Sequence, residues 1–237
     1  MQNVLFSYLG LQDYQITWDL QKIAFQKKIE GFLEKDLFLL QQHNHVYTLG
    51  KNADDKNLLA TEQQLDEEGI KVYQIERGGD ITYHGPGQLI GYPILNLKNY
   101  GLHVGDYMRA LEEMIIQLLS DYGIEARRVQ GRTGVWVKNE KICAMGIRVS
   151  HWITMHGFAL NVNTDLDKFE HIIPCGIADR GVTSMQKLLG YRLQLEEVAE
   201  KIRKKFENIF QAKTEVLSTE GIFQYVGEPT PLHQDLV

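Results

Sequence analysis

Short apolar runs of strand length occur in neighbouring pairs along this chain, and amphipathic helical segments stand before, between and after them. The predicted strands are 37–40, 46–49, 72–75, 134–137, 141–149 and 158–162. Apolar residues recur at helical spacing over about 17–34, 105–122 and 195–210. A doubly wound fold would alternate strand and helix throughout, so we expect an α+β fold, with a mixed or antiparallel β-sheet flanked by helices. In these helices, we expect Phe32 and Tyr122 to be buried.

Composition is ordinary for a globular chain, with 43% hydrophobic and 24% charged residues. No repeat or Pro/Ser-rich linker divides the 237 residues, so we expect a single domain over 1–237. No apolar run is long enough to span a bilayer, and the first residues lack the pattern of a signal peptide. With only two cysteines, these features predict a cytoplasmic protein with no membrane association. The net charge of −6 argues against nucleic-acid binding.

A glycine-rich stretch, RGGDITYHGPGQLIG, covers residues 77–91 directly after a predicted strand. Glycines leave backbone amides uncovered, so a ligand can approach the main chain closely. Arg77, Tyr83 and His84 add polar groups there. The composition fits either a tight loop without a ligand or a binding loop, and the spacing fits neither a dinucleotide motif nor a P-loop.

Lys141 begins a strand whose alternate residues Cys143, Met145, Ile147 and Val149 share one apolar face. A lysine on such a face either serves as a base, because it is partly desolvated, or extends to water from the strand end. Cys143 is expected to be a packed core thiol.

Cys175 lies between Pro174 and Gly176, which is typical of a presented loop. A loop cysteine is either inert or a nucleophile, and the sequence around it does not decide between the two. A disulfide between Cys143 and Cys175 is not expected in a reducing compartment.

Several motifs occur in a specific order: RGGDITYHGPGQLIGYP, GVWV, KICAMGIRV, HGFALNV and IIPCGI. On these motifs, with LQDYQITWDLQ and VYTLGK, the chain resembles the lipoyl(octanoyl) transferases from about Tyr8 to Leu189. The resemblance implies the α+β fold with a mixed sheet that this family shares with lipoate and biotin protein ligases. It also implies an acyltransferase that moves an octanoyl group from acyl carrier protein to a lysine of lipoate-dependent enzymes.

Site residues follow from the resemblance by position. It places the acyl-thioester cysteine at Cys175 and the lysine that tunes it at Lys141. It places substrate-binding residues at Arg77, Gly78, Gly79, Asp80, Ile81, Thr82, Tyr83, His84, Ala144, Met145, Gly146, Gly157, Phe158 and Ala159. The chain departs from the family at Asp80, where Gln is usual, and at Asn44-His45, where prolines are common.

The resemblance implies no cofactor and no metal, since conversion of a thioester to an amide is downhill. The implied acceptors are the lipoyl domains of 2-oxoacid dehydrogenase complexes and the glycine cleavage H protein. A local cationic patch would be needed to bind an acidic carrier, because this chain is itself net negative. The candidates are Arg127, Arg128, Arg132, Lys138 and Arg148.

Three details stay open. The acyl slot could use Tyr83, Met145, Ile147 or Phe158, each of which could equally be ordinary core. Oxyanion donors could lie at Gly78-Gly79 or at Cys175-Gly176. His84 and His156 could each orient the substrate or be structural.

Two other functions compete with acyl transfer. One is an ATP-dependent lipoate or biotin ligase of the same fold, which has little use for Pro-Cys-Gly. The other is a non-catalytic module that binds acyl carrier protein.

Overall fold

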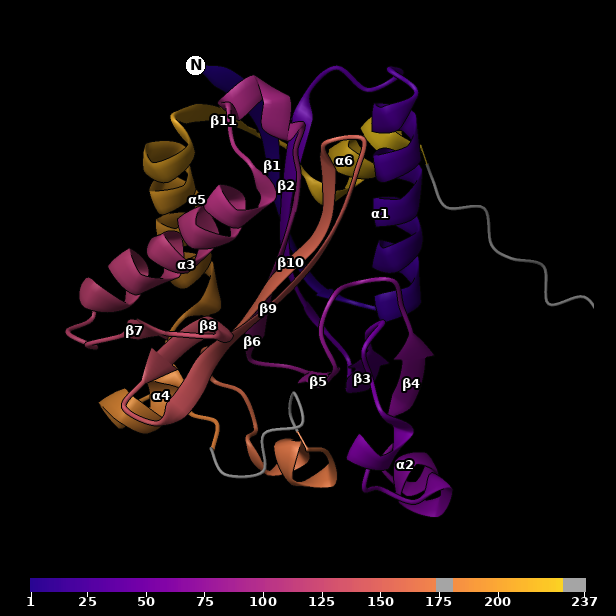
Figure 1. Ribbon diagram of the computed structural model, residues 1–237, viewed down its shortest axis with the longest axis vertical. Coiled ribbons are helices and arrows are strands. Elements are labelled where there is room, and N and C mark those ends of the chain that lie inside the picture. The colour runs from indigo at the N-terminus through magenta and orange to yellow at the C-terminus, as the bar shows by residue number, and fades with distance from the viewer. Residues whose placement is uncertain (174–180, 228–237) are drawn as a thin grey trace, which may run out of the picture.

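A mixed sheet forms the centre of the computed structural model, which describes residues 1–173 and 181–227 (Figure 1). Within these residues the order is β11 (Ala212–Val216), β1 (Gln2–Gln12), β2 (Asp36–His43), β6 (Gln88–Ile94), β10 (Ile153–Asn161), β9 (Glu140–Ser150), β8 (Arg132–Val137) and β7 (Arg127–Val129). β1 pairs in parallel with β11 and β2, and the other neighbours are antiparallel. The predicted mixed sheet is confirmed.

A smaller sheet lies beside this one, in the order β4 (Lys71–Gln74), β3 (Val46–Leu49) and β5 (Ile81–His84). β3 is parallel to β4 and antiparallel to β5. The short helix α2 (Glu62–Glu67) precedes β4, and three 3-10 turns lie at Asp55–Asn57, Leu97–Tyr100 and Asp167–His171. The glycine-rich stretch therefore connects the small sheet to the large one.

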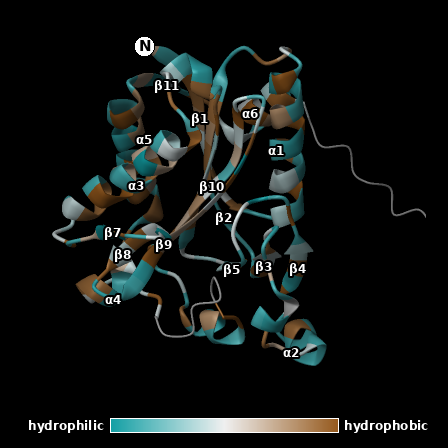
Figure 2. Cartoon of the chain, viewed as in Figure 1, coloured by the Kyte–Doolittle hydropathy of each residue, from teal (hydrophilic) through white to brown (hydrophobic). Residues whose placement is uncertain are grey.

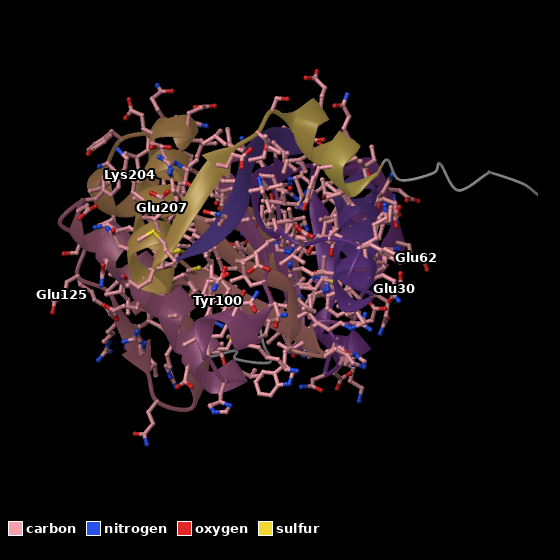
Figure 3. All side chains as sticks on the ribbon, turned by 90° about the horizontal axis from the view of Figure 1, so that it is seen from above. Glu30, Glu62, Tyr100, Glu125, Lys204 and Glu207 are labelled. Carbon is pink, nitrogen blue, oxygen red and sulfur yellow. The ribbon has the colours of Figure 1, made fainter. Side chains whose placement is uncertain are left out.

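Helices cover both faces of the large sheet. One core packs α3 (Val104–Ser120) and α5 (Leu195–Phe210) on one face, and a second packs α1 (Tyr14–Ile29) and α6 (Thr219–Val226) on the other (Figure 1). The hydrophobic residues of these helices turn toward the sheet (Figure 2). Charged side chains such as Glu30, Glu125 and Lys204 extend outward (Figure 3). The short helix α4 (Met185–Leu189) lies near the beginning of the second described range, 181–227. No helix among the described residues is long and apolar enough to cross a membrane.

The helical prediction over 195–210 is confirmed, but the ends of the other two helices differ from expectation. α1 begins after Asp13, whose carboxylate accepts from the backbone N–H of Gln15 and Ile16. The chain leaves the helix before Gly31, whose φ of +82° is left-handed, so Phe32 is 75% exposed rather than buried. Tyr122 lies beyond the end of α3 and is only half-buried.

Several elements were absent from the sequence prediction: β1, α2, β7, α4, β11 and α6. In addition, the second half of the glycine-rich stretch is not a loop, because it forms β5 and the start of β6. β11 is short and half polar, and it pairs with β1 from the opposite end of the chain. Only that long-range pairing identifies it as a strand.

A buried ion pair joins α1 to β2 on the same face as the α1 core. Lys28 Nζ lies 2.6 Å from Asp36 Oδ1, and the two side chains are 4% and 3% exposed. The ammonium also donates to the carbonyl oxygens of Leu33, Glu34 and Lys35. Asp36 accepts further hydrogen bonds from Asn96 N and from the Tyr100 hydroxyl. The pair is therefore fully hydrogen-bonded, which offsets the cost of burying both charges.

We expect Lys28→Met to lower the free energy of unfolding by about 3–5 kcal/mol, because it leaves the Asp36 carboxylate buried without a cation. Urea denaturation followed by circular dichroism measures the change. Lys35→Met is the matched control, because the Lys35–Glu215 pair is exposed, and it should cost far less. Equal losses in the two variants would contradict this account.

Candidate active site

The loop between β4 and β5 lies against the edge of β9. β8 pairs with β9 only as far as Cys143, which leaves the later residues of that edge open. There the Gly78 N–H donates to the Ile147 carbonyl over 3.0 Å. A Cβ on Gly146 would lie only 2.8 Å from the Gly78 carbonyl oxygen, so the contact requires glycine at 146. Because this hydrogen bond occupies the Gly78 N–H, Gly78 cannot be the oxyanion donor that the sequence suggested as one alternative.

Arg77 fastens the same loop to the small sheet. It is 8% exposed, and its Nη2 donates to the Thr48 carbonyl and hydroxyl over 2.6 and 2.9 Å. Asp80 closes the loop, because its carboxylate accepts from the Ile81 N–H and from Asn57 Nδ2, the latter over 2.6 Å. The aspartate that departs from the family pattern therefore has a defined structural role in this chain.

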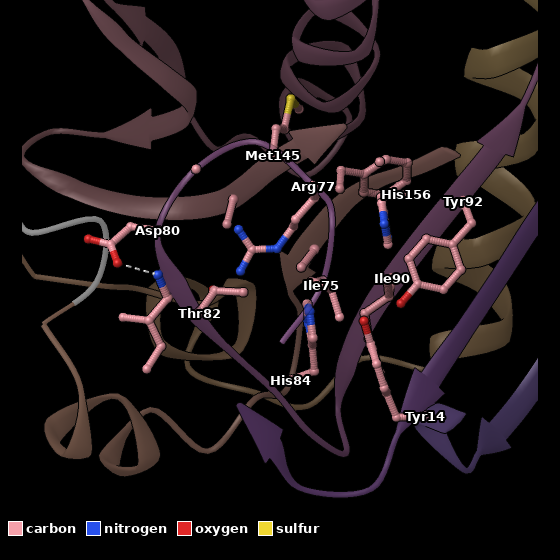
Figure 4. A pocket seen from close by; sticks show the side chains of 17 residues that line it. Tyr14, Ile75, Arg77, Asp80, Thr82, His84, Ile90, Tyr92, Met145 and His156 are labelled. Atoms are coloured by element: carbon pink, nitrogen blue, oxygen red, sulfur yellow. Dashed lines mark hydrogen bonds between the residues drawn. The ribbon is translucent and has the colours of Figure 1, made fainter. Parts of the chain in front are cut away.

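Beneath the loop lies a cavity of about 500 Å³ of empty space, part of it open to solvent (Figure 4). β5, β6, β9, β10, the loop and the first residue of α1 contribute its lining: Tyr14, Ile75, Arg77, Gly79, Asp80, Ile81, Thr82, His84, Ile90, Tyr92, Ala144, Met145, Gly146, His156, Gly157, Phe158 and Ala159. The structure thus brings together most of the predicted substrate-binding residues, from three separate motifs. A mainly apolar lining with a few polar groups is typical of a small-ligand site.

Two of the predicted binding residues do not line this cavity. Tyr83 points into the core of the small sheet, where its hydroxyl hydrogen-bonds with His45 Nδ1 over 2.7 Å and its ring packs against Phe169. Successive residues of a strand face opposite ways, so Tyr83 turns away when Thr82 and His84 face the cavity. Gly78 lines the neighbouring hollow instead.

That neighbouring hollow shares Gly79, Asp80, Met145 and Gly146 with the cavity, and it contains Lys141. Its other walls come from the loops after β3 and β4, from α3, from the β7–β8 turn with the start of β8, and from β9: Asn52, Gly78, Val104, Met108, Gly131, Arg132, Thr133 and Ile147. Ile147, a candidate for the acyl slot, belongs to this hollow. Lys141 therefore lies next to the cavity but not inside it.

Lys141 is held in place by its backbone. Its N–H donates to the Gly181 carbonyl and its carbonyl accepts from Thr183 N–H, each over 3.0 Å. The side chain is largely buried, and Nζ lies 4.9 Å from the centre of the Trp136 ring. The predicted shared face is confirmed, because Met145, Ile147 and Val149 pack against the same core as Cys143. Cys143 is fully buried, and burial raises the pKa of its thiol. Cys143 is therefore a core residue and a poor nucleophile.

Cys175 lies outside the described residues. The described residues on either side of that segment are both anchored beside the two hollows. The Ile173 N–H donates to the carbonyl of Asn57, whose side chain bonds Asp80, and Gly181 pairs with Lys141.

Several lining residues were not predicted as site residues: Tyr14, Ile75, Ile90 and Tyr92. Ile90 and Tyr92 alternate on β6 and face α1. Recognition of 88–94 as a strand would have placed both on one face. Tyr14 lies in the LQDYQITWDLQ motif, but no site role was assigned to it, and the packing of α1 brings it to the cavity.

The predicted cationic patch is partly neutralised in the structure. Arg128 bonds the carboxylates of Glu112 and Glu113, and Arg148 lies 3.4 Å from a Glu76 oxygen. Both side chains are thus paired with carboxylates within the fold, and the docking patch stays a prediction.

Three histidines gather at and behind the cavity, and all three are neutral at physiological pH. Burial lowers the pKa of His43 to about 4, and burial lowers the pKa of His84 and His156 to about 3. His84 Nδ1 lies 2.8 Å from Gln88 Oε1, and His43 Nε2 lies 2.9 Å from the Tyr92 hydroxyl. The uncharged state suits an apolar ligand.

These pKa shifts predict a pH-dependent stability. The unfolded histidines bind protons near pH 6.5 and the folded ones do not, so stability is complete above pH 6.5 and falls as the pH decreases. Between pH 6.5 and 5, the free energy of unfolding should approach a slope of about 4 kcal/mol per pH unit for three histidines. In His43→Gln, denaturation at several pH values should show a slope lower by about one proton. An unchanged slope would contradict the burial of a neutral His43.

Comparisons with known proteins agree with this geometry. Residues 13–207 match the model of the lipoyl protein ligase A/B catalytic domain. The octanoyltransferase of Christiangramia forsetii is 48% identical over 221 residues, covering 86% of this chain and 94% of that protein. The octanoyltransferase of Flavobacterium psychrophilum is 50% identical over 218 residues, covering 85% and 94%.

Solved structures share the fold at low sequence identity. A bi-partite lipoate protein ligase from Thermoplasma acidophilum superposes with a TM-score of 0.70 at 14% identity, covering 95% of this chain and 91% of that one. Plasmodium falciparum LipL1 in complex with lipoate gives 0.70 at 14% identity, covering 94% and 70%. The expected ligase-like α+β fold is confirmed. By its sequence, the chain belongs to the lipoyl protein ligase A/B catalytic domain family and, within it, to the octanoyltransferases, which are acyltransferases of protein lipoylation.

Proposed function

We propose that this enzyme moves an octanoyl group from acyl carrier protein to a lysine of a lipoyl domain, through a thioester on Cys175. The observation that supports this most is the cavity beneath the glycine loop, which adjoins Lys141. Ile75, Ile90, Met145 and Phe158 give it an apolar lining, as an acyl chain requires. The anchoring of Ile173 and Gly181 beside the same two hollows supports Cys175 as the acyl carrier residue.

In the first half-reaction, the Cys175 thiolate attacks the carbonyl carbon of the carrier thioester. The new C–S bond forms, the bond to the pantetheine sulfur breaks, and that sulfur leaves with the electron pair and takes a proton from the Lys141 ammonium. A thiol of ordinary pKa, about 8.5, is only a few per cent ionised at pH 7. An ammonium within about 4 Å stabilises the thiolate by up to about 4 kcal/mol at an effective dielectric of 20.

In the second half-reaction, the amine of the acceptor lysine attacks the octanoyl thioester. The C–N bond forms, the C–S bond to Cys175 breaks, and the amine proton passes to Lys141, which is neutral after the first step. A free lysine is overwhelmingly protonated at pH 7, so the acceptor ammonium first loses one proton to solvent, and Lys141 takes the second proton as the C–N bond forms. The products are an amide and the original Cys175–Lys141 pair, and no ATP is consumed.

The donor and acceptor are both proteins in this proposal. The donor is octanoyl-acyl carrier protein, and the acceptors are lipoyl domains of 2-oxoacid dehydrogenase complexes and the glycine cleavage H protein. The Thermoplasma ligase, which shares the fold, is described with its E2 lipoyl domain, and this supports a lipoyl domain as acceptor. We place the reaction in the cytoplasm and assign it to one domain that spans 1–237.

Intact mass spectrometry tests the covalent step. With octanoyl-carrier and no acceptor, the protein should gain the mass of one octanoyl group, and Cys175→Ala should abolish the gain. Cys143→Ala is the matched control and should still be acylated, because its thiol is buried in the core. Loss of the adduct in Cys143→Ala alone would overturn the assignment, and transfer that needs ATP but not Cys175 would indicate a ligase.

Replacement of Lys141 tests its proposed role as the group that donates and accepts the proton in the two half-reactions. Lys141→Met should slow both loading and transfer by about 10²–10⁴-fold, the range of general acid–base catalysis, because neither half-reaction then has its proton carrier. Single-turnover quench-flow measures the two rates separately. Lys213→Met, an exposed residue of β11 at the other end of the large sheet, should retain both rates. Normal transfer by Lys141→Met would contradict the proposed base.

A further inference from the structure

His156 has an unusual backbone for a residue inside a strand. Its φ is +61°, in the left-handed region that costs a residue with a side chain free energy, and it lies within β10. The Gln21 side chain fixes this conformation, because Gln21 Oε1 accepts from the His156 N–H over 3.2 Å. The unusual φ coincides with a side chain that lines the cavity (Figure 4).

The imidazole of His156 is buried and incompletely hydrogen-bonded. The residue is 2% exposed, and Nε2 has no hydrogen-bond partner among the described residues. The Tyr92 ring meets the imidazole edge-on, with centroids 6.4 Å apart, and the Tyr92 hydroxyl bonds His43. A buried nitrogen without a partner is costly, so this wall is unfavourable for contact with methylene groups.

His156 lies at the end of the cavity that is farther from Lys141. On β9, Lys141 precedes Ala144, which pairs with Ala159, and the paired strands then run on to Ile147 and His156. The Ala144–Ala159 pair is therefore the end near Lys141. Tyr92 and Tyr14 lie on the same side as His156, away from Asp80 and Met145 (Figure 4).

The length between these ends matches a short acyl chain. From Ala159 to His156 the strand advances three residues, or about 10 Å at 3.3 Å per residue. An extended octanoyl chain measures about 9 Å from carbonyl to methyl carbon, at bond lengths near 1.5 Å. A chain loaded at the Lys141 end would thus place its terminal methyl group beside His156.

We infer that His156, supported by Tyr92, is a polar end wall that limits the acyl chain to about eight carbons. This inference rests on the proposed function, because it assumes an acyl chain anchored at the Lys141 end. A longer chain would press methylene groups against Nε2 and leave that nitrogen permanently without a partner. His156 is therefore a specificity-determining residue that acts by polarity and not by bulk alone.

Two substitutions at this position separate polarity from size. In His156→Leu the wall stays filled but becomes apolar, and we expect the ratio of decanoyl to octanoyl loading to rise at least fivefold. In His156→Asn the wall is smaller but polar, and asparagine tolerates a left-handed φ, so octanoyl preference should persist. Intact mass after exposure to equal amounts of the two acyl thioesters gives the ratio, and thermal unfolding checks that each variant is folded.

The unmodified protein provides a test that does not depend on folding of a variant. Nonanoyl and 8-hydroxyoctanoyl thioesters have chains of the same number of heavy atoms and differ only in the polarity of the last one. The hydroxyl group can partner Nε2, so we expect preferential loading of 8-hydroxyoctanoyl over nonanoyl, with the preference lost or reversed in His156→Leu.

The outcomes are distinguishable. If octanoyl loads but nonanoyl competes equally with its hydroxylated counterpart, or the His156→Leu profile equals that of the unmodified protein, the polar wall is wrong and the transferase proposal survives. If His156→Asn accepts decanoyl as readily as His156→Leu, the limit is one of size, which also overturns the inference. If no chain forms an adduct, both proposals fail.

Discussion

The contact between the glycine loop and the open edge of β9 is the constraint on which the site depends. It is a backbone-to-backbone approach, with Gly78 bonded to the Ile147 carbonyl and Gly146 too close to the loop to carry a side chain. Arg77 fastens the other side of the loop to β3. The cavity therefore lies between the large sheet and the small sheet, and the glycines allow the β4–β5 loop to approach β9 closely.

This arrangement separates two tasks that acyl transfer places close together. An apolar chain needs a desolvated slot, whereas the reacting groups need a charged neighbour and access for two protein substrates. The cavity meets the first need with neutral histidines and apolar side chains, and the hollow beside it contains Lys141. Because the two share Met145 and Gly146, a chain in one can have its carbonyl group at the border of the other.

Local patterns predicted the local structure well, and long-range contacts explain what they missed. Helical spacing located α5, and strand alternation placed Lys141 and Cys143 on one face. β1 and β11 pair in parallel across the whole chain, which no local pattern shows. The motifs identified most of the cavity lining, but Tyr14 reaches it only through packing of α1. Arg128 was visible as a charge, and its partners Glu112 and Glu113 were not.

The position of the bound chain tests the central claim most directly. We would load the protein with an octanoyl group carrying ¹³C at the carbonyl and terminal methyl carbons and record nuclear Overhauser effects by NMR. The account predicts a protein thioester carbonyl signal, with the methyl group in contact with the rings of Tyr92 and His156. Methyl contacts with Val104 and Met108 instead would place the chain in the neighbouring hollow and contradict it.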